Sequence, residues 1–336
     1  MVALKLLRNI LLPFVPVYGA ITKVRNYAYD QNIFDSKEYD FPIICVGNLS
    51  VGGTGKSPMV EYLIRLLRNY KLATLSRGYK RKTKGFKIAD ATSSASSIGD
   101  EPFQFYSKFD DIIVAVDANR QHGITQLRNL ENSPEIILLD DAYQHRKVKA
   151  GFNILLTAYD KLYVNDICLP TGDLREPISG SKRANIIVVT KCPDNLDAIE
   201  KNKIIKKLQP LKEQVVFFSS IKYSDKIISI DDIRPLNGLI EGFTLVTGIA
   251  NPKPLLEYLY SQSLHFEHIS FNDHHNFSQE EIADLKKREF ILTTEKDFMR
   301  LKDHLDSDKL YYLPIQVEID ENEMLDSLIK NFVDSY

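Results

Sequence analysis

One short stretch, residues 47–57, constrains the fold of this chain more than any other part of the sequence. It reads GNLSVGGTGKS and stands directly between the apolar run Ile43–Val46 and the helical run Met59–Arg68. The stretch fits the pattern G-x-x-x-x-G-K-[ST], with Ser50 at the place of the first glycine. Its glycines allow a tight turn whose N–H groups point at one anion, and the N-terminus of the following helix adds partial positive charge. The sequence therefore predicts a phosphate-binding loop that leaves a buried strand and begins a helix.

This loop predicts the roles of particular residues. Lys56 would reach the β- and γ-phosphates of a nucleotide, and the Ser57 hydroxyl would ligate Mg²⁺. Because Mg²⁺ takes oxygen ligands, an acidic residue is also expected at the end of another buried strand. The run EIILLDD supplies it: Asp140 would hold the metal, directly or through water, and Asp141 would assist. The expected nucleotide contacts are Ser50, Val51, Gly52, Gly53, Thr54, Gly55, Lys56 and Ser57.

The sequence matches the motifs of GTPases and of partitioning-type ATPases only in part, and these mismatches indicate which nucleotide is bound. A GTPase would carry a glycine shortly after the aspartate-bearing strand and an [NT]-K-x-D guanine reader. Here Ala142 follows the aspartates, and the segment 190–194 (TKCPD) places its aspartate one position too far along. The loop is also similar to those of partitioning-type ATPases, but Val51 stands where those proteins carry a signature lysine. These departures favour ATP and a class other than these two.

Apolar, β-branched runs alternate with helical patterns, which indicates parallel strands joined by crossover helices. The runs form two series of about five, so we expect an α/β protein with a P-loop parallel-sheet domain and a second, smaller α/β domain. We expect an N-terminal region at 1–30, the P-loop domain at 31–160 with a possible return of 318–336, and the second domain at 161–317, closing over the active site. The strands are expected near Ile43–Gly47, Leu72–Ser76, Ile112–Val116, Ile136–Leu139, Ile154–Thr157, Ile186–Thr190, Val215–Ser219, Thr244–Thr247, Phe290–Thr293 and Tyr312–Val317.

Composition and the N-terminal segment indicate the expected partners, the redox compartment and the contact with a membrane. The 43 Lys and Arg residues nearly cancel the 45 Asp and Glu residues, so nucleic acid is not an expected partner. The three cysteines show no C-x-x-C spacing, which favours a reducing compartment. The uncharged run 10–22 contains two prolines and is shorter than the roughly 20 apolar residues that a membrane-spanning helix needs. It is either a first helix packed on the core or a helix lying in the membrane interface.

Two polar clusters could belong to one active site only if the two domains face each other. The segment Gly99-Asp100-Glu101-Pro102 offers adjacent carboxylates before a helical run, although by itself it is equally an N-cap with Asp100 as the capping residue. The segment Asp273-His274-His275 is unspecific alone. A kinase that acts on an alcohol benefits from a group that accepts the hydroxyl proton near the γ-phosphate. Asp100 is a candidate for that group.

Taken together, these motifs resemble the tetraacyldisaccharide 4′-kinase family, the lipid A 4′-kinases. The matching pieces run in family order from about Pro42 to Asp297 and cover most of the chain. The chain departs from the family pattern at Ala142, at Ser57 in place of threonine, and at Asp173 in place of proline. Besides the segments above, the matching pieces are Ser76-Arg77-Gly78-Tyr79, Gln144-His145, Leu174-Arg175-Glu176-Pro177, Gly248-Ile249-Ala250-Asn251-Pro252, Phe271-x-Asp273 and Thr294-Glu295-Lys296-Asp297.

The resemblance implies transfer of the ATP γ-phosphate to the 4′-hydroxyl of an acylated glucosamine disaccharide 1-phosphate, which gives lipid IVA. It implies peripheral or monotopic binding at the cytoplasmic face of the bacterial inner membrane, favours the interfacial N-terminal helix, and indicates no obligate protein partner. The alternative is a membrane-associated P-loop nucleotide switch or ATPase without a sugar acceptor. The resemblance implies Asp100 as general base with His274 as its partner, and Lys56 at the transferring phosphoryl group. The residues implied near Mg²⁺ are Ser57, Glu101, Asp140 and Asp141. The implied substrate or phosphate contacts are Arg77, Arg120, Arg175 and Glu176.

Overall fold

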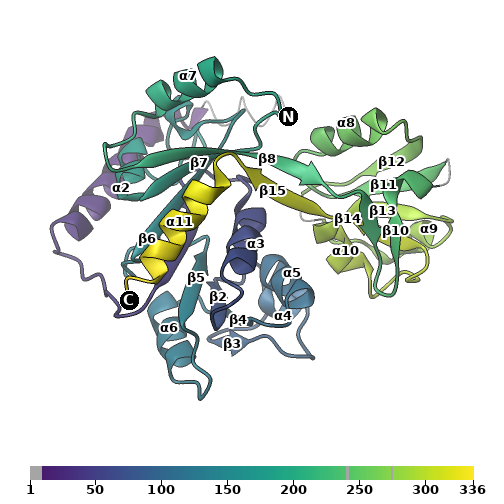
Figure 1. Cartoon of the computed structure of the whole chain (residues 1–336), viewed down its shortest axis with the longest axis horizontal. Coiled ribbons are helices and arrows are strands. Elements are labelled where there is room, and N and C mark those ends of the chain that lie inside the picture. The colour runs from purple at the N-terminus through teal and green to yellow at the C-terminus, as the bar shows by residue number, and fades with distance from the viewer. Residues whose placement is uncertain (1–9, 240–241, 274) are drawn as a thin grey trace.

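The computed structural model describes residues 10–239, 242–273 and 275–336, and it arranges them around two sheets (Figure 1). Neighbouring strands of the larger sheet pair in parallel except at its two edges, where β15 and β3 are antiparallel to their neighbours. Within the described ranges this sheet has nine strands, in the order β15 (Ile315–Ile319), β8 (Val215–Tyr223), β7 (Ile186–Thr190), β6 (Phe152–Ala158), β1 (Ile43–Asn48), β5 (Ile136–Asp140), β2 (Leu72–Ser76), β4 (Ile113–Val116) and β3 (Lys87–Ile88).

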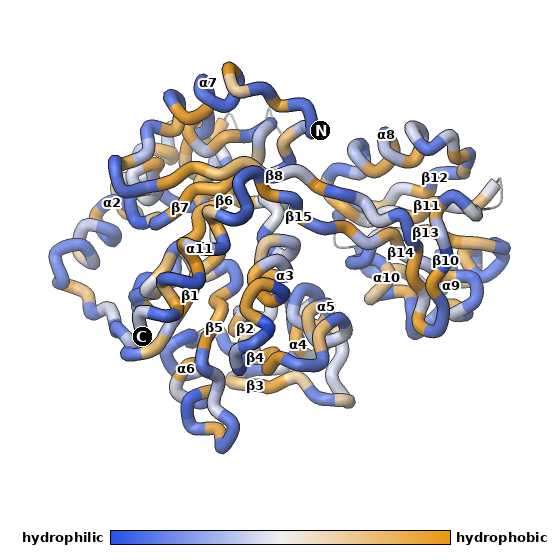
Figure 2. The backbone as a smooth tube through the Cα atoms, viewed as in Figure 1, coloured by the Kyte–Doolittle hydropathy of each residue, from blue (hydrophilic) through white to orange (hydrophobic). Residues whose placement is uncertain are grey.

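Helices cover both faces of the larger sheet. On one face, α3 (Lys56–Leu66) and α11 (Asn322–Val333) bury apolar side chains such as Leu63 and Ile329. On the other face, α6 (Arg120–Arg128) and α7 (Ala198–Leu208) pack through side chains such as Leu127 and Ile204. The strands between these layers are mostly hydrophobic in Figure 2, as expected for a parallel sheet that is buried on both sides. The α/β class with a P-loop-type sheet is therefore confirmed.

The second sheet forms the core of a separate, smaller domain at the right of Figure 1. Its strand order is β10 (Ile233–Pro235), β9 (Lys226–Ile228), β14 (Leu310–Leu313), β13 (Ile291–Thr294), β11 (Phe243–Thr247) and β12 (Phe266–Ser270). The last four of these strands run parallel, whereas β9 and β10 form an antiparallel hairpin at one edge. The accompanying helices are α8 (Lys253–Ser261), α9 (Gln279–Leu285) and α10 (Glu295–Leu301), and the short 3₁₀ segments of the chain are η1 (Leu12–Phe14), η2 (Tyr163–Asn165), η3 (Ile178–Arg183) and η4 (Leu236–Gly238).

The expected division of the chain near residue 160 requires correction. Strands β7 and β8 were expected in the second domain, but they extend the larger sheet, with β7 paired to β6 and β8 paired to β7. The chain leaves the first domain along β8 and returns along β15, which pairs antiparallel with the end of β8. The expected strand Tyr312–Val317 is divided by Pro314 into β14 and β15, one in each sheet. The C-terminal helix α11 packs on the larger sheet, as expected for 318–336.

The N-terminal helix α2 (Val15–Asp30) has one packed side and one exposed side. Near its C-terminal end, Asn26, Ala28 and Tyr29 are buried against the first domain. Its opposite side exposes an apolar stripe that includes Val17, Ile21 and Val24. None of the helices in the described part of the chain is both long and apolar enough to cross a membrane.

The two domains meet through a short pair of helices, α4 (Ala95–Ile98) and α5 (Asp100–Lys108), that lies beside β4. Helix α10 of the second domain packs on α5. One apolar cluster crosses the contact: Ile98 and Phe103 of the first domain join Phe298 and Met299 of the second. The residues around position 100 are therefore held between both domains.

Candidate active site

The glycine-rich loop begins at the end of β1, in the middle of the larger sheet. Gly55 caps α3 with φ of 83° and Gly52 has φ of 109°, a left-handed backbone that side chains other than glycine rarely adopt. Gly47 is required for a different reason, because a Cβ atom there would lie 2.6 Å from Cβ of Tyr143. The predicted sequence of strand, loop and helix is confirmed at this position.

Two neighbouring segments form hydrogen bonds to the loop. The amide of Val51 donates to the carbonyl oxygen of Asp173 at 2.7 Å. The Thr190 hydroxyl donates to the carbonyl of Thr54 at 2.8 Å, and Lys191 Nζ donates to the carbonyl of Gly53 at 2.6 Å. From the sequence, 190–194 is only an imperfect guanine reader, and Lys191 has no predicted role. In the structure this segment follows β7, which lies two positions from β1 in the sheet, and so it reaches the loop.

Lys56 faces the second of the two aspartates. Its Nζ lies 3.6 Å from Oδ1 of Asp141 and 3.4 Å from Oδ1 of Asn48. Arg175 Nη1 donates to the same Asp141 oxygen at 2.9 Å. Burial raises the pKa of Asp141, but the charges of Lys56 and Arg175 outweigh it, so the net pKa is lowered. Asp141 is therefore ionised at neutral pH and joins Lys56 to Arg175.

Asp140, at the end of β5, is in a different state. Its side chain is 5% exposed, and no group in the described residues donates to its Oδ1 atom. Burial raises its pKa to about 7, and the charges of Asp141 and Glu101 add to the effect. A buried carboxylate oxygen without a donor, beside a second carboxylate and the buried Ser57, suits a hard cation such as Mg²⁺.

The metal would need further ligands. In the described residues, no group of three or more His, Cys, Asp or Glu side chains is arranged to hold a metal ion. Mg²⁺ is usually bound by one or two carboxylates, with substrate phosphates and water completing its shell. The residues present therefore fit the ion together with a bound nucleotide.

The two acidic residues at the start of α5 face the second domain. Asp100 forms an ion pair with Arg300, and Glu101 Oε1 lies 3.1 Å from Nζ of Lys296, both on α10. Gly99 precedes them with φ of 99° and caps α5 in place of Asp100, so Asp100 is the first residue of the helix and not its cap. The charge of Glu101 contributes to the raised pKa of Asp140, which places Glu101 near the metal candidates. His274, the expected partner of Asp100, lies outside the described residues.

The two predicted arginines on this side of the sheet differ in exposure. Arg120, at the start of α6, is 3% exposed, and its Nη1 donates to the carbonyl of Asp117 at 2.9 Å. No acceptor for its Nε is found among the described residues. Burial lowers the pKa of Arg120, while the charges of Asp140 and Asp141 act in the opposite direction. Arg77 is exposed and lines a hollow of about 360 Å³ with Lys80, Arg81 and Lys84.

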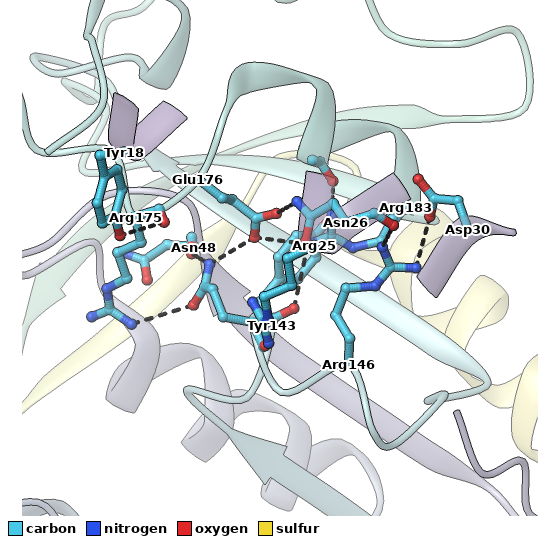
Figure 3. A network of polar contacts seen from close by, with 12 residues as sticks. Tyr18, Arg25, Asn26, Asp30, Asn48, Tyr143, Arg146, Arg175, Glu176 and Arg183 are labelled. Carbon is cyan, nitrogen blue, oxygen red and sulfur yellow. Dashed lines mark hydrogen bonds and ion pairs between the residues drawn. The ribbon is translucent and has the colours of Figure 1, made fainter. Parts of the chain in front are cut away.

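Glu176 is the centre of a buried polar network (Figure 3). It is 2% exposed, and its two oxygens accept hydrogen bonds from Arg183 at 2.8 Å, Asn26 at 2.6 Å and Gln144 at 3.0 Å. The same Gln144 amide donates to the carbonyl of Asn48 at 2.8 Å. Glu176 therefore ties α2 to the base of the phosphate-binding loop, and its role as a substrate contact stays a prediction.

His145 follows Gln144 and had no assigned role, although the pair belongs to the motifs that carried the resemblance. Among the described residues, no group pairs with its buried Nε2 atom. Burial lowers its pKa to about 4, helped by the charges of Arg120 and Lys147. The imidazole is therefore neutral at physiological pH and can act as a hydrogen-bonding group beside the basic residues.

A central parallel strand that ends in a glycine-rich loop, next to a strand that ends in two aspartates, defines a P-loop nucleotide-binding protein. In this chain a second domain also packs on helix α5, through α10. The chain belongs to the LpxK family, described as tetraacyldisaccharide-1-P 4′-kinase, whose model matches residues 7–334.

Similar proteins cover nearly the whole chain. The tetraacyldisaccharide 4′-kinase of Flavobacterium johnsoniae is 54% identical over 93% of both chains, and that of Porphyromonas gingivalis is 39% identical over 91% of both. The crystal structure of LpxK from Aquifex aeolicus in complex with ATP is 31% identical, with a TM-score of 0.79, and the match covers 97% of this chain and 99% of that one. The family predicted from the sequence motifs is confirmed, and so is the predicted fold.

Proposed function

We propose that this protein transfers the γ-phosphate of ATP to the 4′-hydroxyl of tetraacyldisaccharide 1-phosphate and so forms lipid IVA. The observation that carries the proposal is the convergence of the phosphate-binding loop, the pair Asp140 and Asp141, and the α5 carboxylates between two domains. Proteins with this name resemble the chain along nearly its full length. A P-loop sheet alone fits many activities, so the second domain and its contact with Asp100 matter for the choice.

In this mechanism the residues of the loop bind and orient the triphosphate. The backbone amides from 50 to 57 and the N-terminus of α3 attract its oxygens, and Lys56 exchanges its contact with Asp141 for the β- and γ-phosphates. Ser57, Asp140 and Asp141, with Glu101, would hold Mg²⁺, which when bound neutralises charge on the transferring group. Arg175 keeps Asp141 ionised.

Asp100 is the proposed general base. It stands at the beginning of α5, next to Glu101, and would accept the proton of the attacking 4′-hydroxyl as that oxygen approaches the γ-phosphorus. Positioning of the two reactants also contributes to the acceleration. His274 is proposed as the partner of Asp100, on the strength of the family resemblance.

The acceptor is anionic, and the basic hollow suits it. Arg77, Lys80, Arg81 and Lys84 line this hollow together with Gly78, which packs against Gly99, the residue before Asp100. A Cβ atom on Gly99 would lie 3.2 Å from the Cα of Gly78, so the hollow directly adjoins the proposed base. We propose that it receives a phosphate of the glycolipid, with Arg77 as the contact nearest the active site.

The acyl chains require contact with a lipid phase, and α2 offers it. Its apolar stripe is exposed, with Val17, Ile21 and Val24 each more than half accessible. The other side of α2 is tied to the site, since Tyr18 donates to the carbonyl of Arg175 at 2.9 Å. We propose that this stripe lies in the cytoplasmic leaflet of the inner membrane, so that the protein binds the membrane peripherally.

The test is label transfer from γ-³²P-ATP to a purified tetraacyldisaccharide 1-phosphate in detergent with magnesium. Wild-type protein is expected to label the lipid, and Asp100→Asn to lose about 10² to 10⁴-fold in kcat with ATP affinity in calorimetry unchanged. Asp111→Asn, at an exposed position just beyond α5, is the matched control and should retain wild-type kcat. Release of free phosphate without lipid labelling would instead support an ATPase or a nucleotide switch.

A further inference from the structure

Helices α5 and α10 are joined across the domain boundary by three ion pairs. Arg300 pairs with Asp100, Lys296 with Glu101 at 3.1 Å, and Lys108 with Glu295 at 2.8 Å. The first two pairs involve the acidic residues of the proposed reaction centre, whereas the third lies at the opposite end of α5. Two ion pairs of this interface therefore involve residues of the proposed reaction centre, and the pair of Lys108 with Glu295 does not.

Arg300 is itself held by a fully buried carboxylate. Asp297 is 0% exposed, and its Oδ1 accepts from Arg300 Nη1 at 3.3 Å. Its Oδ2 accepts from the amide of Gly248 at 2.8 Å and from the hydroxyl of Thr294 at 2.7 Å. A buried carboxylate is costly unless it is paired and hydrogen-bonded in this way. Both motifs that the phosphate-transfer mechanism leaves unused, around Gly248 and around Thr294–Asp297, thus meet at one side chain.

Gly248, which Asp297 holds, lies beside Asn272, the residue before Asp273. A Cβ atom on Gly248 would lie 2.8 Å from Oδ1 of Asp297 and 3.4 Å from the carbonyl oxygen of Asn272, so both oxygens lie next to Gly248. The carbonyl of Asn272 also accepts from the amide of His275 at 3.1 Å. Asp297 is therefore linked to Asn272 through Gly248, and through Arg300 it reaches Asp100.

We propose that Asp297 and Arg300 are positioning residues that fix the Asp100 carboxylate relative to the second domain. Neither residue needs to touch the nucleotide or the acceptor. Arg300 holds Oδ2 of Asp100, and Asp297 holds Arg300, so the direction of the Asp100 carboxylate depends on correct docking of the second domain. This inference rests on the proposed function, because it concerns the residue assigned there as the base.

Changes at Arg300 or Asp297 are expected to slow the chemical step and to leave nucleotide binding intact. A small misplacement of a reacting group costs up to about 10²-fold in rate even when binding is intact. Arg300→Gln is therefore expected to lower kcat by about 10²-fold, with KM for ATP within about twofold of wild type. Arg300→Lys keeps the charge and should recover part of the loss. Asp297→Asn, which keeps the size of the side chain, should resemble Arg300→Gln.

The matched control is Glu295→Gln, which removes an ion pair from the same helix and the same interface without touching Asp100. The experiment measures kcat and KM for the three variants and the control, and hydrogen exchange of the amides at 99–104 in the full-length protein. Exchange in this segment is expected to rise in Arg300→Gln and Asp297→Asn and to stay at the wild-type rate in Glu295→Gln, because only the former release the first turn of α5.

Two outcomes would overturn the inference. Unchanged kcat in Arg300→Gln would show that the contact has no effect on the base, and equal losses of kcat in Arg300→Gln and Glu295→Gln would reduce it to a general interface contact. Failure of the proposed function looks different: the wild-type protein would then label no lipid, while faster exchange at 99–104 in Arg300→Gln would still report the positioning contact.

Discussion

Replacement of the buried Asp140 by asparagine should stabilise the metal-free protein at high pH. Folding raises the pKa of Asp140 from 3.8 to about 7. Between these values the folded protein binds a proton that the unfolded chain has released, so stability falls as pH rises through this window. One pKa unit corresponds to about 1.4 kcal/mol, so ionised Asp140 costs roughly 4 kcal/mol above pH 7. The asparagine variant avoids that cost.

The predicted signature is a pH-dependent difference between the variant and the wild type. The gain of Asp140→Asn in unfolding free energy should grow by roughly 3 kcal/mol from pH 5 to pH 8. Differential scanning calorimetry in EDTA measures it as a widening of the difference in melting temperature by about 5 °C. Magnesium with a non-hydrolysable ATP analogue should stabilise the wild type more than the variant, since the variant lacks one anionic ligand.

A difference that is the same at pH 5 and pH 8 would refute the assignment of a buried carboxylate with a raised pKa. A variant that is less stable than wild type at pH 8 would refute it as well, because the side chain would then be engaged in contacts that favour its charged form.

Three further predictions follow from particular contacts. Gly47→Ala should lower the free energy of unfolding by about 1–3 kcal/mol in urea titrations, because its Cβ would lie 2.6 Å from Cβ of Tyr143; an unaffected midpoint would contradict this close contact. Lys56→Met should weaken ATP binding at least about tenfold in calorimetry while the melting temperature stays near the wild-type value, and full affinity would remove Lys56 from the phosphate site. Ile21→Glu should reduce co-sedimentation with anionic phospholipid vesicles, and Glu213→Gln, at an exposed position beyond α7, is its control; equal sedimentation of both variants would exclude the α2 stripe as the contact.

Much of the site was predictable from local sequence. The loop from Gly47 to Ser57 and the strand that ends at Asp140 are both short segments whose chemistry is written in consecutive residues. Glycine requirements, apolar runs and helix starts each depend on a few consecutive residues, so they can be recognised without knowledge of the fold. The structure pairs β1 with β5 in parallel, so the two segments lie at the same edge of the sheet.

The tertiary structure alone decided which sheet each strand joins and what the remaining polar residues do. Strands β7 and β8 have the same apolar pattern as strands of either domain, and only their pairing with β6 places them in the first. Glu176 is as polar as Glu101 in the sequence, yet it is buried and accepts hydrogen bonds from Asn26 and Gln144, far away in the sequence. The contact between Arg300 and Asp100 joins residues 200 positions apart. Such pairings depend on how whole elements pack, and no local pattern encodes them.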